Sequence, residues 1–417
     1  MNKIDGLRAF EILDSRGRPT VMTVCKLSDG SYGKAAVPSG ASTGTSEAVE
    51  LRDGDDTRYN GLGCLQAVNN VNTVIRAAVT AQAFASQQAL DDRLIALDGT
   101  HNKSKLGANA ILSVSLAFAR ACAMAEGVEL YEFFGRMADT QPRLPRPMIN
   151  LFSGGKHAGQ QVSIQDVQIA FPKAESLSET FAAMYDIYYT AARQAQERYG
   201  VRLLTADEGG LAPPFASSEE MLGAAVAAID RVGLIAGQDA CLTVDVAATH
   251  FYNDTGQYDL DGAPTSADGL IDLYEQWIQQ HHIVSLEDAL HEEAWPDWTR
   301  LATRIGNEVL VLGDDLLCTN PQRIEKAIAS GAANSLLLKV NQIGTLSEAL
   351  AALKLARQAG WQIVISARSG ETEDNWLADL ATGWAADYIK VGSITQSERL
   401  AKYNRLLELE ALNTLSL

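Results

Sequence analysis

The stretch EVLVLGDDLLCTNPQRIEKAIASGAANSLLLKVNQ, residues 308–342, decides the fold class. It contains two short apolar runs with a helix-like segment between them, and each run ends on a charged side chain. The first run ends on Asp314 and the second on Lys339, which lies 25 residues later. Because a buried strand with its covering helix takes this length, the stretch predicts one βα unit followed by the strand of the next.

The same arrangement recurs along the second part of the chain. Four more apolar runs carry a polar side chain at or near their ends: CLTVDV with Asp245, HHIVSLED with Glu287, QIVISARS with Arg368 and ADYIKVGS with Lys390. Such runs are typical of buried parallel strands. Six units in series favour a closed barrel over an open sheet, because an eight-stranded βα barrel takes about 250 residues and residues 147–417 supply that length.

The first part of the chain has a different pattern. GLRAFEILDSRGRPTVMTVCKLSDGSYGKAAV, residues 6–37, alternates strand-like runs with polar turns and predicts a three-stranded meander. Helical periodicity follows over 64–98 and over an apolar segment that we expect to end near Gly127. The chain is therefore predicted to be an α/β protein with two domains: a small α+β domain over 1–138 and a βα barrel over 139–417.

Composition narrows the functional classes. The chain has 417 residues and a formal net charge of −18, which disfavours nucleic acid and anionic membranes as partners. Its longest apolar runs are shorter than a membrane span, and its first residues lack the apolar core of a secretory signal. The five cysteines are scattered without a CxxC pair, which is typical of reduced thiols in the cytoplasm.

Three carboxylates are predicted to meet at the mouth of the barrel. Asp245, Glu287 and Asp314 close successive strands, and the carboxyl ends of barrel strands carry active sites. Three ionised carboxylates need a cation, and oxygen ligands alone favour Mg²⁺ or Mn²⁺. Two alternatives stay open: each acid is a helix N-cap, or the set is neutralised by Lys339 and Lys390 without a metal.

The lysines and an arginine extend this interpretation. A lysine beside another cation and a divalent metal has its ammonium form disfavoured, so Lys339 or Lys390 is a candidate general base. A base beside a metal-bound carboxylate indicates removal of a proton next to that carboxylate. Arg368 and Ser369 offer a guanidinium fork and a hydroxyl, which suit a phosphate. Glu208, in TADEGGLAPP, is either an acid close to a ligand or a solvated side chain.

Several longer motifs resemble those of the enolase family: EILDSRGRPTV, PSGASTG, NKSKLGANAILSVSLA, DEGG, SLLLKVNQIGTLSEAL and SGETED. They occur in the family's order and span nearly the whole chain. The resemblance implies a lyase that dehydrates 2-phosphoglycerate in glycolysis, with a small α+β domain, a barrel whose first units are irregular, two Mg²⁺ ions, a homodimer and a cytoplasmic location.

The resemblance also implies a role for each site residue. Lys339 would take the C2 proton, and Glu208 would protonate the departing C3 hydroxyl. The implied first-metal ligands are Asp245, Glu287 and Asp314, and Ser42 would meet the second metal. The implied substrate contacts are Lys390 with the carboxylate, Arg368 and Ser369 with the phosphoryl group, and His157, Gln165 and Asp166 elsewhere on the substrate.

The chain departs from the family pattern at three positions. Ala367 stands where enolases carry histidine, Asp166 where they carry glutamate, and Ser153 where they carry asparagine. Ala367 indicates either a divergent enolase in which water fills the gap, or a substrate with a bulkier anionic group. The second alternative matches an enolase relative that forms carboxyphosphonoenolpyruvate from a phosphonylated hydroxy acid. A third is a non-catalytic binding protein.

Overall fold

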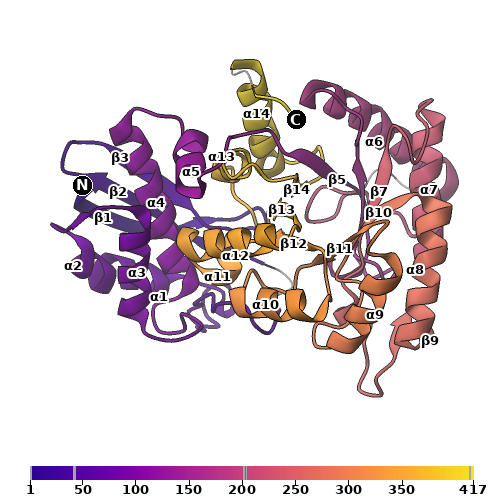
Figure 1. The fold of residues 1–417 in the computed structure, drawn as a ribbon, viewed down its shortest axis with the longest axis horizontal. Helices are drawn as coiled ribbons and strands as arrows, with labels where there is room; N and C mark the ends of the chain where they lie inside the picture. The colour runs from indigo at the N-terminus through magenta and orange to yellow at the C-terminus, as the bar shows by residue number, and fades with distance from the viewer. Residues whose placement is uncertain (1, 41–43, 201, 203, 413–414) are drawn as a thin grey trace.

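Two structural units follow one another along the chain, and Figure 1 shows the N-terminal unit beside a larger barrel. The structure is a computed structural model and describes residues 2–40, 44–200, 202, 204–412 and 415–417. Both predicted components of the fold, the small α+β unit and the closed βα barrel, are confirmed.

The N-terminal unit is built on a four-stranded antiparallel sheet. The predicted meander is present as β1 (Asn2–Leu13), β2 (Pro19–Leu27) and β3 (Tyr32–Ala36). The sheet order is β3-β2-β1-β4, with the two-residue strand β4 (Ala83–Phe84) on the outer side of β1. The helical pattern over 64–98 is interrupted by β4: α2 ends at Val79, Thr80 is already extended, and Ala81 takes a left-handed φ of 63° before the strand.

Helices cover this sheet and form the core of the unit. Around β4 lie α1 (Leu65–Asn70), a π-helical turn (Val71–Ile75), α2 (Arg76–Val79) and α3 (Gln87–Asp98), and α5 (Leu130–Ala138) closes the unit. The apolar helix α4 (Ala108–Glu126) packs on β2 and β3 and ends at left-handed Gly127, as predicted. Among the described residues α4 alone is long and apolar enough to cross a membrane. However, 83% of its most apolar 18-residue segment is buried inside the protein, so we interpret α4 as a core helix.

The second unit is a closed eight-stranded barrel with the order β10-β11-β12-β13-β14-β5-β6-β7. The regular strands are β7 (Cys241–Asp245), β10 (Ile283–Glu287), β11 (Leu310–Gly313), β12 (Ser335–Leu338), β13 (Gln362–Ser366) and β14 (Tyr388–Gly392). These six strands are the six runs identified in the sequence. Closure comes from β5 (Arg146–Ser153) and β6 (Asp166–Ala170), and β6 runs antiparallel to both of its neighbours.

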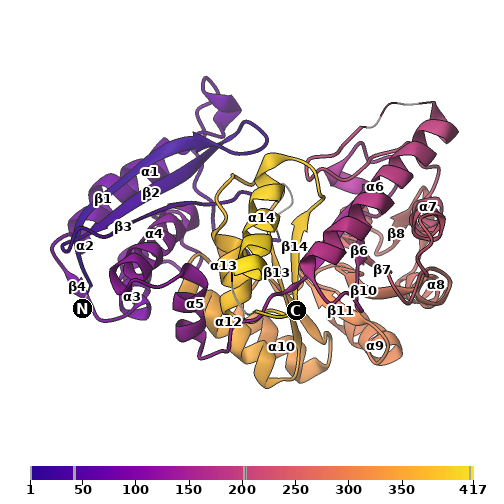
Figure 2. The same ribbon diagram turned by 90° about the horizontal axis from the view of Figure 1, so that it is seen from above.

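Helices surround the barrel, as the views in Figures 1 and 2 show. Two long helices, α6 (Leu177–Tyr199) and α7 (Ser218–Arg231), separate the antiparallel strand from the regular units. The remaining helices are α8 (Ala267–His281), α9 (Trp295–Ile305), α10 (Pro321–Ser330), α11 (Val340–Ile343), α12 (Leu346–Gln358), α13 (Trp376–Gly383) and α14 (Ser397–Leu412). A small hairpin, β8 (Tyr258–Leu260) with β9 (Ala263–Thr265), and short 3-10 turns (Tyr59–Gly61, Gly155–His157, Ala248–Phe251) complete the fold.

The two units are packed against each other beside the barrel mouth. Helix α5 packs against α13, and α3 packs against α12. Closer to the mouth, Ser39 and Gly370 exchange two backbone hydrogen bonds of 2.8 and 2.9 Å. The N-terminal unit therefore contributes to the wall of the site.

Candidate active site

The polar residues predicted at the strand ends lie at one end of the barrel. Asp245 and Glu287 are the last residues of β7 and β10, and they are direct partners in the parallel ladder. Asp314 follows β11, and Lys339 follows β12. Lys390 lies within β14, opposite Ser366 at the end of β13. The parallel register brings these side chains together because each apolar run stops at the same level of the barrel.

Two lysines form ion pairs with the three predicted metal ligands. The Lys390 ammonium lies 2.8 Å from Asp245 Oδ2 and 2.7 Å from Glu287 Oε2. Lys339 forms an ion pair with Asp314, whose other oxygen accepts a 2.7 Å hydrogen bond from Gln342 Nε2. The three acids and Lys390 are buried, and the Lys339 side chain is 11% exposed. The salt-bridge network that the sequence left open as an alternative is thus present. Whether the site also suits a metal ion depends on the negative charge that the two lysines leave uncompensated.

The charge balance of this cluster fits a divalent cation. With all of its groups ionised, the cluster of three carboxylates and two ammonium groups has one uncompensated negative charge, which a bound cation would neutralise. Burial raises the pKa of Glu287 well above its usual value, and the charge of Asp245 raises it further. Burial also raises the pKa of Asp245, but Lys390 outweighs this and holds it at about 2. Because all the donors are oxygens, Mg²⁺ suits the set better than a thiolate-preferring metal.

Asp288 supports this cluster although the sequence did not single it out. Its carboxylate accepts hydrogen bonds from the backbone N–H groups of Asp314 at 3.0 Å and Asp315 at 2.8 Å. Its own backbone is left-handed, with φ of 44°, which is unfavourable for a residue other than glycine. Carboxylate oxygens of Asp288, Asp314 and Asp315 lie within 4.8 Å of one another. The signal in the sequence that could have indicated this arrangement is that a second acid, Asp288 or Asp315, directly follows the strand-end acids Glu287 and Asp314.

The lysine environment differs from the one expected from the sequence. A lysine beside another cation was expected to lose its proton easily. Burial, the largest single influence, lowers the pKa of Lys339, and so does the neighbouring Arg368, but the carboxylates around it, Asp314 first, together raise the pKa overall. Lys339 is therefore an ammonium ion while it is paired with Asp314.

A second polar cluster adjoins the first, since Asp166 of β6 is the ladder partner of Asp245 on the neighbouring strand β7. His157 Nδ1 lies 2.6 Å from Asp166 Oδ2, and the Ser153 hydroxyl donates to the other Asp166 oxygen at 2.6 Å. His157 Nε2 lies 4.0 Å from Glu208, which also accepts a 3.1 Å hydrogen bond from Asn150. Burial lowers the pKa of His157, but the charges of Asp166 and Glu208 outweigh it and raise the pKa to about 9. His157 is therefore an imidazolium between two carboxylates at neutral pH.

The predicted anion-binding residues follow β13. Arg368 forms a bidentate ion pair with Glu47, with distances of 3.1 and 3.2 Å, and donates to Asn341 at 3.0 Å. The Ser369 hydroxyl accepts a 3.3 Å hydrogen bond from Arg16 of the N-terminal unit. Ala367 is 6% exposed and borders the same cleft. Sequence reasoning missed the three partners Glu47, Asn341 and Arg16, since all of them reach this point from distant parts of the chain.

One cleft joins most of these groups. Gln165 donates from Nε2 to Asp245 Oδ2 at 3.2 Å, and so connects the carboxylate–lysine cluster with the segment that carries Asp166. Ser42 lies outside the described residues. The residues that line the cleft are His157, Gln165, Glu208, Asp245, Lys339, Ser366, Ala367, Arg368, Ser369 and Lys390. A lysine, a glutamate and an arginine that were predicted as site residues therefore face the same small space.

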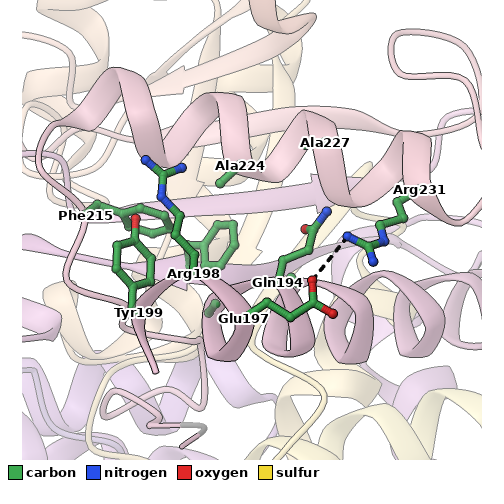
Figure 3. A pocket seen from close by; sticks show the side chains of 11 residues that line it. Gln194, Glu197, Arg198, Tyr199, Phe215, Ala224, Ala227 and Arg231 are labelled. Atoms are coloured by element: carbon green, nitrogen blue, oxygen red, sulfur yellow. Dashed lines mark ion pairs between the residues drawn. The ribbon is translucent and has the colours of Figure 1, made fainter. Parts of the chain in front are cut away.

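A wider cavity of about 350 Å³ lies between α6 and α7, away from the strand ends, and is shown in Figure 3. Its aromatic wall includes Phe215, and its charged groups neutralise one another. Arg231 pairs with Glu197 at 3.5 Å, and Arg198 pairs with Glu220. Because the charged side chains described in the wall of this cavity are paired in this way, we place the active site at the barrel mouth.

Comparison with known proteins agrees with this geometry. Residues 4–134 match the family model described as the enolase N-terminal domain, and residues 141–414 match the enolase C-terminal TIM barrel domain. The chain is similar to a protein named enolase from Methanopyrus kandleri, with 47% identity over 412 residues, which cover 98% of this chain and 96% of that relative.

Proposed function

Since this chain belongs to the enolase family and is a carbon–oxygen lyase, we propose that it dehydrates 2-phosphoglycerate to phosphoenolpyruvate in a Mg²⁺-dependent reaction. The main support is the presence of Lys339, Glu208 and Arg368 on the walls of one cleft. A base and an acid in one cleft suit removal of a proton and of a hydroxyl from adjacent carbons. A guanidinium and a hydroxyl at the end of the cleft suit the phosphoryl group.

The proposed roles follow from these positions. Lys339 accepts the C2 proton after it has released its own proton to solvent, and this release requires Asp314 to turn to another partner, because the ion pair with Asp314 keeps Lys339 protonated. Glu208 passes a proton to the C3 hydroxyl, and the neighbouring His157 imidazolium is the source of that proton. Asp166 orients His157. The substrate carboxylate lies near Lys390 and Gln165, and the phosphoryl group lies against Arg368 and Ser369.

Mg²⁺ is proposed as the cofactor, with two ions in each active site. The first would be held by Asp245, Glu287 and Asp314, and the second by Ser42 with the substrate. When bound, Mg²⁺ would stabilise the negative charge that the substrate carboxylate gains as C2 loses its proton. From the family we further propose a cytoplasmic homodimer and a domain boundary between residues 138 and 139.

Ala367 supports a second candidate substrate. It borders the cleft beside Arg368, where a methyl group leaves more room than an imidazole. A phosphonylated hydroxy acid with an additional carboxylate would use that room, and its dehydration would give carboxyphosphonoenolpyruvate. A non-catalytic role is less well supported, because the cleft keeps several buried charges that are costly to bury and give a binding protein no evident advantage.

A steady-state assay distinguishes these proposals. Formation of the enolpyruvate double bond is followed by ultraviolet absorbance, with Mg²⁺ and either 2-phosphoglycerate or the phosphonylated substrate. Rapid turnover of 2-phosphoglycerate, lost on chelation and restored by Mg²⁺, supports the first proposal. Turnover of the phosphonylated substrate alone, with 2-phosphoglycerate turnover recovered in Ala367→His, supports the second. Turnover of neither substrate leaves the binding-protein hypothesis.

A further inference from the structure

The turn between β1 and β2 reaches from the N-terminal unit to the Arg368–Gly370 segment. Asp14 shapes this turn, since its Oδ1 accepts the backbone N–H groups of Arg16 and Arg18 at 2.9 Å each. Ser15 then exchanges hydrogen bonds with Glu371: its N–H donates to the carbonyl oxygen at 2.7 Å, and its hydroxyl accepts at 3.2 Å. The turn is therefore attached to the barrel immediately after the proposed phosphoryl-binding residues.

Gly370 makes this close approach possible. A Cβ atom at position 370 would lie 2.8 Å from the Ser39 carbonyl oxygen, and closer still to the Arg16 guanidinium and the Asp14 carboxylate. Any side chain at this position would push the turn away from the barrel. Arg16 can therefore take its observed position only because residue 370 is a glycine.

The Arg16 side chain is buried at this junction, and one of its hydrogen-bond donors has no partner among the described residues. Its side chain is 7% exposed. Nη1 donates to the Ser369 hydroxyl at 3.3 Å, and Nη2 donates to the Ser39 carbonyl oxygen at 3.1 Å. Nε is buried and has no hydrogen-bond partner among the described residues. A buried guanidinium with a spare donor is costly for folding, which indicates that a ligand uses it.

The charge balance also calls for a second cation here. A phosphoryl group carries close to two negative charges at neutral pH. Arg368 is already paired with Glu47 through both of its terminal nitrogens. Burial lowers the pKa of Arg16, and Asp14 only partly offsets that effect. A guanidinium remains protonated in proteins nonetheless, so an additional anion would stabilise Arg16.

We propose that Arg16 is a substrate-positioning residue that orients the Ser369 hydroxyl and presents a second guanidinium to the phosphoryl group from the N-terminal unit. This inference rests on the proposed function only in assigning Ser369 to the phosphoryl group. In this proposal the phosphoryl group is bound by residues of both structural units: Arg16 from the N-terminal unit, and Arg368 and Ser369 from the barrel.

The test measures anion binding directly, without turnover. Inorganic phosphate and lactate are titrated separately, and apparent Kd values are obtained from the rise in Tm. Arg16→Met is expected to weaken phosphate binding by about 10- to 100-fold, the effect of losing a charged hydrogen bond, and to leave lactate binding unchanged. Arg18→Met, an exposed arginine of the same turn, is the matched control and should change neither.

Two further variants keep the test informative if Arg16→Met does not fold. Gly370→Ala retains Arg16 but displaces it, and should also weaken phosphate binding selectively. Arg16→Lys retains the charge without the fork and should fall between the wild type and Arg16→Met. Unchanged phosphate binding in Arg16→Met, an equal loss for both anions, or no phosphate effect on the wild type overturns the inference. Phosphate binding without enolpyruvate formation would instead contradict the proposed function alone.

Discussion

The two ends of the cleft hold their charges in opposite ways. At the carboxylate end, Asp245, Glu287 and Asp314 outnumber Lys339 and Lys390, so negative charge is in excess. At the anion-binding end, the cations come from two structural units, and only Arg368 is paired with a carboxylate through both terminal nitrogens.

This difference indicates how the site recognises ligands. Each end is neutralised in part by side chains of the chain itself, so a ligand must replace an internal ion pair. A cation would replace a lysine at one end, and a phosphoryl group would replace Glu47 at the other. Because a buried ion pair is worth little net stability, such an exchange costs little free energy. The same pairs hold the charged side chains in position while no ligand is bound.

The largest expected effect is on the base at the carboxylate end. Lys339→Ala should lower turnover by about 100- to 10,000-fold, the range for loss of a positioned base, and should abolish exchange of the C2 proton with solvent. Proton exchange is followed by NMR of the substrate in deuterated water. Stabilisation by Mg²⁺ should persist, because the three carboxylates remain. Lys354→Ala on the exposed face of α12 is the control; undiminished exchange in Lys339→Ala would show that the base is another residue.

At the anion-binding end, Glu47→Gln should separate stability from binding. Leaving Arg368 without its charged partner should lower the free energy of unfolding by about 3 kcal/mol, as for other broken buried pairs. Phosphate should then bind more tightly, because it no longer competes with a carboxylate. Thermal unfolding with and without inorganic phosphate measures both effects. Weaker phosphate binding in this variant would mean that Glu47 supports the anion site instead of competing with the ligand.

Metal removal tests the excess charge of the carboxylate end. Mg²⁺ at 100 times its Kd should stabilise the protein by about 2.7 kcal/mol, and a chelator should reverse this. Asp245→Asn should lose most of that stabilisation, since one ligand charge is removed. The matched control is Asp254→Asn, an exposed acid beyond the mouth. Equal Mg²⁺ responses in the two variants would contradict the proposed ligand set.

The last prediction concerns the pH dependence of stability and the His157–Asp166 pair beside the carboxylate end. The pKa of His157 is raised from 6.5 to about 9 in the folded protein, so its charge stabilises the fold fully below about pH 6.5 and progressively less as the pH rises through 9. The loss should be on the order of 3 kcal/mol, since each unit of the pKa shift corresponds to about 1.4 kcal/mol. Unfolding between pH 6 and 10 should show this decline in the wild type and a smaller one in His157→Gln. Parallel curves for the two proteins would assign the decline to other groups.

Much of the fold was predictable because burial imposes a simple pattern on the chain. The runs ending near Asp245, Glu287 and Asp314 were predictable as buried strands because they are short and apolar, and from Glu287 onward such runs recur about every 25 residues. The antiparallel strand β6 could not be predicted from the same pattern. Its sequence is as apolar as that of the parallel strands, and its direction depends on pairing with β5 and β7.

The sequence by itself determined the apolar runs, the level at which each stops and the charged residue types at their ends, because these follow from local burial and spacing. Only the tertiary structure decided which charges meet. Glu47 reaches Arg368 across more than 300 residues of chain, Asp288 holds the next strand end, and Arg16 enters from another unit. Such contacts depend on long-range packing and hydrogen bonding, which leave no periodic signal in the chain.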